Sequence, residues 1–421
     1  MQAGNAMTGN GADGQPQVRK DSIRSAASAV PTAARPRGRI GVLLARILLV
    51  VIFVAGAFFS LVPTGRSAAR TAVLLPALLG QRAPGILTVA DEPIRHTQMS
   101  VPSQGGDVYL DVYAPTAPAP PVPGVRQGLI LIPGVGDNRT VDQLVNLSTS
   151  LAHKGIVVMN MTTQTLIDYD LSAVDSDAVV QAYLSLARWP GVGAGRIGIV
   201  GFSAGGTLGF LAAADPRMRD TVSFITIFGG YYDATTLLRD FGRRALLVDG
   251  QLHKWTPDPV PLLVLGNAIA DTLPPKEASL LRSADWSNAA PLDANQVAQL
   301  SPPAQAAYHL LTGDEPNAAD ANIAALSPQM HTLLRTLSPS AVISQVRTPI
   351  YLLHDRNDVF IPFTQSRDFA AALTRLGHPH DFAEFDIFAH VEVRTGEGIG
   401  PLLRDGVTLF RIINELLLPA S

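Results

Sequence analysis

The chain has 421 residues, a formal net charge of −3 and no cysteine, and 47% of its residues are hydrophobic against 16% charged. This composition excludes disulfides, thiolate metal sites and a cysteine nucleophile, and the lack of a basic excess argues against a nucleic-acid partner. The length leaves room for a sizeable core, in one large domain with additions or in two or three domains.

The first 62 residues separate into a polar lead and an apolar run. Residues 1–39 are rich in Gly, Ala, Ser, Pro and Arg without apolar periodicity, and are predicted to form a disordered tail. Residues 40–62 are apolar throughout except for Arg46. As a helix they would extend roughly 35 Å, enough to cross a hydrocarbon core of about 30 Å. The sequence therefore predicts a single-pass transmembrane helix that contacts the lipid bilayer.

Basic residues predict the orientation of this helix. More of them precede the helix than follow it, so the positive-inside rule places the N-terminus in the cytoplasm and the large C-terminal part outside. A secreted protein with a signal peptide cleaved near Ala55-Gly56-Ala57 is the lesser alternative, because 39 residues make a long leader. A buried core helix is the third. Residues 63–92 are predicted to be a juxtamembrane linker, since Pro76 interrupts their apolar stretch. The preceding basic residues are Arg19, Lys20, Arg24, Arg35, Arg37 and Arg39, and the following ones are Arg66 and Arg70.

Residues 93–421 are predicted to form an α/β domain, because short apolar runs alternate with amphipathic segments. Alternating apolar and polar residues predict antiparallel strands at 94–102 and 106–115, joined at Gly105-Gly106. Strands alternating with helices specify a mostly parallel sheet with helices on both faces. The further strands are expected at 128–136, 155–162, 197–202, 222–230, 348–355 and 381–388, and the helices at 139–154, 173–188, from 204 to about 214, 363–377 and 401–418.

Residues 233–338 interrupt this alternation. The segment is rich in Ala, Leu and Pro, has helical periodicity and shows no clear strand. It is too long for a structureless loop, so we predict a helical cap insertion over one edge of the sheet. If the insertion covers an active site, Trp255, Trp286 and Tyr308 would make the pocket apolar. The equal alternative is that these aromatic side chains form the core of the insertion itself.

The segment Gly201-Phe202-Ser203-Ala204-Gly205 is the only GxSxG pattern in the chain, and it stands between a predicted strand and a predicted helix. A serine in such a sharp turn has a strained backbone, and glycines on either side remove the Cβ atoms that would clash. The helix N-terminus beside it offers free N–H groups to a developing oxyanion. Ser203 is therefore the predicted nucleophile.

With this motif in this context, the chain resembles the α/β-hydrolase superfamily, especially its dienelactone-hydrolase-like and prolyl-peptidase-like members. The resemblance covers about residues 93–232 and 339–421. It implies an α/β-hydrolase sheet and a triad in the order Ser, Asp or Glu, His. It also implies that the acid follows the next-to-last strand and that the histidine follows the last.

Two aspartates compete for the position of the acid. Residues 348–362, TPIYLLHDRNDVFIP, resemble the HGxxDxxVP stretch of the family, with His354 in its first position and Asp358 in the acid position. Asp355 stands where a glycine is usual. We favour Asp358, because Asp355 follows the strand too closely and is better placed to cap a turn.

His390 is the predicted general base, because it follows the last predicted strand. His378 and His380 precede that strand and would lie at its opposite end. In the mechanism that these positions imply, His390 takes the proton of Ser203, and the aspartate orients and stabilises the imidazole.

The turn Pro133-Gly134-Val135-Gly136 resembles the HGxG oxyanion loop of the family, with Pro133 in place of the histidine. Only backbone N–H groups are needed there, so the predicted oxyanion-hole donors are those of Val135 and Ala204. Asp137 and Asn138 follow this turn. They could face the pocket or cap the next helix, and we expect them to cap it.

These observations predict a serine hydrolase that cleaves a carboxylic ester through an acyl-enzyme, with an amide or short peptide as the less favoured substrate. The expected partner is a small acyl compound of apolar character, and the chemistry requires neither a cofactor nor a metal. Two alternatives remain open. The same triad would serve an acyltransferase, and the changes at Pro133 and Asp355 would suit a catalytically silent, membrane-tethered binding domain.

Overall fold

The computed structural model describes residues 64, 65, 67, 68, 71 and 72, and then residues 91–119, 124–288, 290–394 and 399–417. All of them belong to one compact unit, residues 57–421. The predicted tail 1–39 and the predicted transmembrane helix 40–62 lie outside the described residues, as does most of the predicted linker 63–92. Within the described part of the chain, no helix combines the length and the apolar character that crossing a membrane requires.

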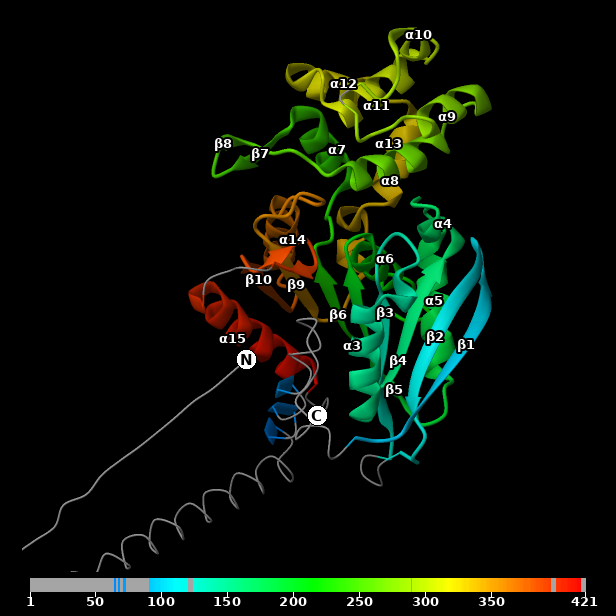
Figure 1. Ribbon diagram of the computed structural model, residues 1–421, viewed down its shortest axis with the longest axis vertical. Helices are drawn as coiled ribbons and strands as arrows, with labels where there is room; N and C mark the ends of the chain where they lie inside the picture. The colour runs from blue at the N-terminus through cyan, green and yellow to red at the C-terminus, as the bar shows by residue number, and fades with distance from the viewer. Residues whose placement is uncertain are drawn as a thin grey trace, which may run out of the picture. The chain divides into compact units, whose positions relative to one another are not determined.

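An eight-stranded sheet occupies the centre of this unit, in the order β1-β2-β4-β3-β5-β6-β9-β10 (Figure 1). The β1–β2 and β2–β4 pairs are antiparallel, and every other pair is parallel. The predicted hairpin at Gly105-Gly106 and the mostly parallel sheet are therefore confirmed. The strands are β1 (Ile94–Ser103), β2 (Gly106–Pro115), β3 (Arg126–Ile132), β4 (Val157–Thr163), β5 (Val192–Phe202), β6 (Val222–Phe228), β9 (Ile350–Asp355) and β10 (His380–Phe385).

Helices cover both faces of the sheet, as predicted. On β3, Leu129 and Leu131 pack toward α3 (Asp142–His153) and α15 (Ile399–Leu416). Ile130 and Ile132 belong to the core on the opposite face, which is covered by three other helices. Because both faces are buried, these strands are continuous apolar runs rather than alternating ones. The helices of the second face are α5 (Asp175–Ala187), α6 (Ala204–Ala212) and α14 (Thr364–Arg375).

The segment 233–338 is an insertion between β6 and β9, and Figure 1 shows its helices grouped beyond one end of the sheet. Their predicted helical character is correct. The insertion comprises α7 (Ala234–Arg243), α8 (Pro259–Ala270), α9 (Pro275–Arg282), α10 (Ala294–Val297), α11 (Pro302–Thr312), η3 (Pro316–Ala318), α12 (Ala319–Ala325) and α13 (Pro328–Thr336). Short elements elsewhere are η2 (Asn138–Thr140), α4 (Gln164–Ile167), η4 (Pro339–Ala341), η5 (Ile343–Gln345), β11 (Phe388–Ala389) and β12 (Glu392–Val393).

The expectation that the insertion contains no strand is wrong. The insertion contains two short strands, β7 (Ala245–Val248) and β8 (Gln251–Lys254), which pair as an antiparallel hairpin. The two residues between them, Asp249 and Gly250, both have positive φ, at 51° and 80°. An Asp-Gly pair is a strong signal for this kind of two-residue turn, and the surrounding helical periodicity concealed it.

Candidate active site

Ser203 lies at the sharp turn between β5 and α6, where the sequence places the nucleophile. Its backbone has φ 54° and ψ −133°, a conformation that non-glycine residues rarely adopt. The Ser203 N–H donates a hydrogen bond to the carbonyl of Phe228 at the end of β6, at 2.8 Å. The strained residue is thus held by the neighbouring strand, and its position does not depend on the hydroxyl.

Three glycines leave the space in which this turn is built. A Cβ atom on Gly201 would lie 2.3 Å from the Cα of Gly206, and one on Gly205 would lie 2.4 Å from the carbonyl oxygen of Ile132. Both glycines were named from the motif. Gly206 is a third, because its Cβ would lie 2.8 Å from the side chain of Ile227. The Gly205-Gly206 pair in the sequence could have indicated this third close approach.

His390 and Asp358 form a buried hydrogen-bonded pair. The Nδ1 atom of His390 lies 2.6 Å from Oδ2 of Asp358, and the two residues are 8% and 2% exposed. The other carboxylate oxygen, Oδ1, accepts the backbone N–H groups of Phe360 at 2.7 Å and Ile361 at 3.0 Å. A carboxylate can only accept here, so Nδ1 carries the proton and Nε2 is left as the basic atom.

Charge and hydrogen bonding keep the carboxylate of Asp358 ionised. Burial alone would raise the pKa of Asp358, but the positive charge of His390 and hydrogen bonds from His354 and His390 hold that pKa well below its usual range. His354 is itself fully buried, with Nδ1 2.6 Å from the hydroxyl of Ser366 and Nε2 2.9 Å from the carbonyl of Ile361. It therefore shapes the loop that carries the acid.

Asp355, the competing aspartate, has a different environment. Its Oδ1 accepts the N–H of Asn357 at 2.5 Å, and its Oδ2 accepts the N–H of Phe388 in β11 at 2.7 Å. Burial raises the pKa of Asp355 to about 6. The carboxylate thus ties the turn after β9 to the segment that leads to His390, while the hydrogen bond to the imidazole comes from Asp358.

Two residues confine the imidazole of His390. The ring of Phe360 stacks on it at a centroid distance of 4.7 Å and an angle of 16°. A Cβ atom on Gly229 would lie 3.0 Å from Cε1 of His390, so the close approach favours glycine. Gly229 and His390 also both have positive φ, at 65° and 58°. Sequence reasoning missed Phe360 and Gly229. The Gly229-Gly230 pair after β6 was a signal for the second.

Ser203 and His390 line one cavity of about 460 Å³. The structure therefore brings the imidazole and the carboxylate into direct contact and places Ser203 in the same cavity as His390. In the described part of the chain, no hydrogen bond joins the Ser203 hydroxyl to the His390 ring. Hydrogen bonds of this kind are often long before a substrate is bound and shorten in the reacting complex.

Val135 and Ala204, the predicted oxyanion-hole donors, line the same cavity. Ala204 is the first residue of α6, where helix geometry leaves the N–H without an intrahelical acceptor. Within the described residues, the N–H of Val135 makes no hydrogen bond. The loop runs against the nucleophile turn, since a Cβ atom on Gly134 would lie 3.4 Å from the Cβ of Ser203. Both N–H groups therefore belong to residues that line the cavity together with Ser203 and Pro133.

The expected capping by Asp137 and Asn138 is wrong. Asp137 makes no capping hydrogen bond, because Arg139 engages both of its carboxylate oxygens at 2.9 and 3.0 Å. Asn138 donates its Nδ2 to the carbonyl of Val135 at 2.7 Å and lines the cavity. The residue before α3 is Val141, which has no side chain that could cap. Asn138 thus stabilises the oxyanion loop.

The insertion supplies an apolar wall to the cavity. Leu237 of α7 and Val260, Val264 and Leu265 of α8 face the cavity that contains Ser203. Tyr169 also lines it, with a positive φ of 56° and its carbonyl bound by Asn267 of α8 at 3.0 Å. No sequence pattern pointed to Tyr169, since its place depends on contact with the insertion.

None of the three aromatic residues singled out in the insertion lines this cavity. Trp286 and Tyr308 pack against each other with ring centroids 6.2 Å apart, so the alternative in which they form the insertion's own core is correct for them. Trp255 has another role. Its Nε1 donates to the backbone carbonyl of Asp358 at 3.0 Å, and its ring stacks on Phe241. The insertion thereby holds the acid loop.

Comparison with known proteins found solved structures of similar architecture. A puromycin-hydrolyzing peptidase of Mycobacterium tuberculosis is 18% identical with a TM-score of 0.48, over 80% of this chain and 40% of that one. Uncomplexed acylaminoacyl peptidase of Pyrococcus horikoshii is 14% identical with a TM-score of 0.47, over 81% and 46%. A 2,6-dihydroxy-pseudo-oxynicotine hydrolase is 14% identical with a TM-score of 0.41, over 77% and 68%. The chain thus spans less than half the length of both peptidases.

No protein-family model and no curated protein matches the chain. Its fold is defined by its own features: two antiparallel strand pairs and then parallel ones, a nucleophile turn after β5, an acid after β9 and a histidine after β10. These are the features of the α/β-hydrolase fold, which the sequence predicted. Two of the neighbours named above are peptidases, whereas the sequence favours an ester as the substrate of this chain.

Proposed function

We propose that this protein is a serine hydrolase that uses Ser203, His390 and Asp358 as a catalytic triad. The observation that carries the proposal is the buried contact of 2.6 Å between His390 and Asp358 in the cavity that also contains the strained Ser203. A carboxylate in that position fixes the imidazole tautomer in which Nε2 can accept a proton. Phe360 and Gly229 limit rotation of the ring.

The reaction follows from this arrangement. Nε2 of His390 takes the proton of the Ser203 hydroxyl as Oγ forms a bond to the carbonyl carbon of the substrate. The N–H groups of Val135 and Ala204 bind the resulting oxyanion. The bond to the leaving alcohol then breaks, and its oxygen receives the proton from His390. Water repeats these steps on the acyl-enzyme and releases the acid. Each proton is returned, so the triad is restored without a co-reactant.

Covalent labelling of the full-length protein tests this proposal. A fluorophosphonate probe should label the wild type at Ser203 and should fail to label Ser203→Ala, while p-nitrophenyl acetate hydrolysis falls by roughly 10⁴-fold or more in that variant. Ser176→Ala is the control, because Ser176 is the second residue of α5 and its exposed hydroxyl donates to the carbonyl of Ala173. Labelling that persists in Ser203→Ala and disappears in the control would refute the assignment.

The apolar cavity wall supports an acyl ester with an apolar acyl group as the substrate class. Val264 and Leu265 of α8 face the triad, and no charged side chain of the insertion lines the cavity among the described residues. A matched pair decides between ester and amide: the p-nitrophenyl ester and the p-nitroanilide of the same acid. We expect turnover of the ester to exceed that of the anilide. Faster anilide turnover, or transfer to an added alcohol in place of hydrolysis, would favour a peptidase or an acyltransferase.

We also propose that residues 40–62 anchor the protein in a membrane, with the N-terminus in the cytoplasm and the catalytic domain outside. The support is the apolar run with basic residues on its N-terminal side. The full-length protein should remain in the membrane fraction after a carbonate wash, and an external protease should reach the catalytic domain in intact cells. Release of a species that begins near residue 58 would favour a cleaved signal peptide.

A further inference from the structure

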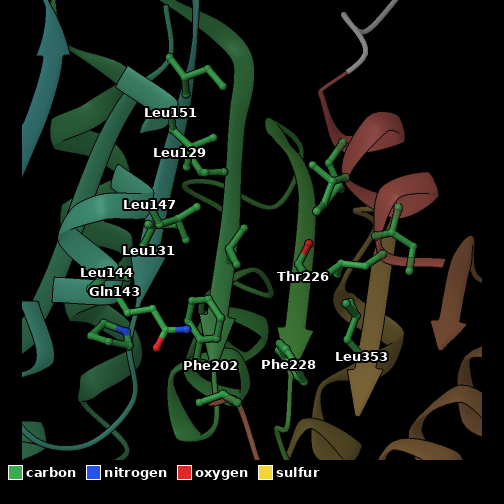
Figure 2. Close-up of a pocket in the computed structure, with 18 of the residues that line it drawn as sticks. Leu129, Leu131, Gln143, Leu144, Leu147, Leu151, Phe202, Thr226, Phe228 and Leu353 are labelled. Atoms are coloured by element: carbon green, nitrogen blue, oxygen red, sulfur yellow. The ribbon is translucent and has the colours of Figure 1, made fainter. Parts of the chain in front are cut away.

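A second cavity, of about 330 Å³, lies on the face of the sheet that α3 and α15 cover (Figure 2). Leu147 and Leu151 of α3 form one wall, Ile412 of α15 forms the other, and Leu131 and Phe228 lie on the sheet between them. Most side chains that line the cavity are apolar, and the polar ones are Gln127, Asn138, Gln143, Thr226 and Glu392. Leucines line it from position 144 to position 151, a rise of about 10 Å along α3. We call this space the α3–α15 groove.

The groove adjoins the catalytic cavity. Pro133 and Asn138 of the oxyanion loop line both spaces, and so do Val391 and Glu392, which follow His390. The loop with the proposed oxyanion donor and the loop with the proposed base therefore also line the end of the groove that lies at the carboxyl end of β3. The two cavities therefore share part of their walls at these loops.

Thr226 gives a second, independent indication that the groove holds a ligand. It lies on β6 two residues before Phe228 and lines the groove (Figure 2). It is 5% exposed, and its hydroxyl has no hydrogen-bond partner among the residues that the structure describes. Buried hydroxyl groups are normally paired, because leaving one unpaired costs free energy. An occupant with an oxygen atom at this depth would satisfy the Thr226 hydroxyl.

We propose that the α3–α15 groove binds the acyl chain of the substrate, so that a medium-length alkyl chain lies against Leu131 and Leu147 while its carbonyl carbon is at Ser203. This inference rests on the proposed function, and it names the substrate class more closely than the catalytic cavity does. Its physical basis is the removal of alkyl surface from water into a wall that is already apolar. The protein would then prefer longer acyl groups to acetate.

Narrowing the groove tests this preference in the full-length protein. With p-nitrophenyl octanoate and p-nitrophenyl acetate, Leu147→Trp should lower the ratio of the two kcat/KM values by about tenfold or more, because indole fills the space that the methylenes would occupy. Leu403→Trp is the matched control on α15, since Leu403 is 64% exposed. Its ratio should equal that of the wild type. An unchanged ratio in a folded Leu147→Trp variant would overturn the proposal.

A binding experiment separates failure of the groove from failure of the triad. Ser203→Ala is irradiated with a diazirine-bearing dodecanoate, and the labelled peptides are mapped. Labels on residues 144–151 or 409–417 support the groove even if no ester is hydrolysed, and labels confined to other peptides overturn it. The labelling experiment keeps leucine at position 147, so its result remains valid if the Leu147→Trp variant fails to fold.

The competing occupant is a segment of the same chain, residues 73–90, which is rich in Leu, Val and Ala. The hydroxyl of Ser67, six residues before this segment, donates to the carbonyl of Asn414 at 2.6 Å, so described residues that precede the segment contact α15, which lines the groove. A photoreactive residue at position 147 distinguishes the two occupants. Cross-links to residues 73–90 that dodecanoate does not displace would overturn the proposal, and cross-links that dodecanoate suppresses would support it.

Discussion

The turn that carries Ser203 and the pair formed by His390 and Asp358 meet in one cavity but are held in place differently. The turn depends on the absence of side-chain atoms within a few residues of sequence, since Gly201 and Gly205 admit no Cβ. The pair depends on hydrogen bonds between segments far apart in the chain. The comparison teaches that the first arrangement is steric and rests on glycines close to Ser203 in the sequence that meet the backbone of the turn and of β3, whereas the second is polar, so the two should respond differently to substitution.

The largest effect is expected where the pair itself is broken. Asp358→Asn should lower kcat for p-nitrophenyl acetate on the order of 10³–10⁴-fold, because the amide neither stabilises the imidazolium nor favours the required tautomer. Steady-state kinetics on the purified variant measure this. Asp355→Asn is the matched control, and its kcat should fall by less than about tenfold, since Asp355 binds only backbone N–H groups. Equal losses in the two variants would contradict the assignment of the acid.

Adding a Cβ atom in the turn that carries Ser203 should lower the stability of the protein. Gly201→Ala places a Cβ 2.3 Å from the Cα of Gly206, and its three nearest atoms are all backbone atoms of Gly205 and Gly206, which leaves little room for relief. We expect a loss of about 3 kcal/mol or more in the free energy of unfolding, measured by urea denaturation. Gly406→Ala makes the same change on α15, where no atom lies within 4 Å, and should gain about 0.5–1 kcal/mol. A Gly201→Ala variant as stable as the wild type would refute the steric argument.

The hydrogen bond from the insertion to Asp358 should contribute less to the free energy of unfolding than the glycine at position 201. Trp255→Phe removes the hydrogen bond from Nε1 to the carbonyl of Asp358 and should cost about 1 kcal/mol more than Trp286→Phe. The comparison is matched, because both residues are buried and the Nε1 of Trp286 has no partner. The difference between the losses of unfolding free energy in Trp255→Phe and Trp286→Phe therefore measures the contribution of the Trp255 hydrogen bond. Equal losses would show that Trp255 acts only through packing.

The last prediction concerns the dependence of stability on pH. Burial raises the pKa of Asp355 from 3.8 to about 6, so the native state binds more protons than the unfolded state between these values. Stability should therefore fall as the pH rises through this window, and Asp355→Asn should remove that fall. Asp358 behaves oppositely, since its lowered pKa adds stability that is lost only as the pH drops below its ordinary value of 3.8. Urea titrations of wild type and Asp355→Asn across the window measure the difference. A difference that rises with pH would contradict the sign.

Much of the fold could be predicted from sequence patterns that extend over only a few residues. The runs that became β3 and β6 are apolar without alternation, as strands buried on both faces must be. The nucleophile turn could be predicted because its glycines stand beside the residue that they accommodate. The hairpin β7–β8 was missed although Asp249-Gly250 is a good turn signal, because helical periodicity dominated the surrounding segment. The order of candidate residues along the chain suggested the site, but their contacts could not be obtained from it.

The sequence by itself determined the alternation of strands and helices, the strained position of Ser203 and the short set of residues from which an acid and a base could come. Only the tertiary structure decided that Asp358 rather than Asp355 contacts His390, that Trp255 of the insertion donates to the carbonyl of Asp358, and that the wall of the cavity comes from α7 and α8. The physical reason is the separation of these groups along the chain. Sterics and periodicity act within a few residues, whereas these two hydrogen bonds join groups 32 and 103 residues apart and exist only once the fold brings them together.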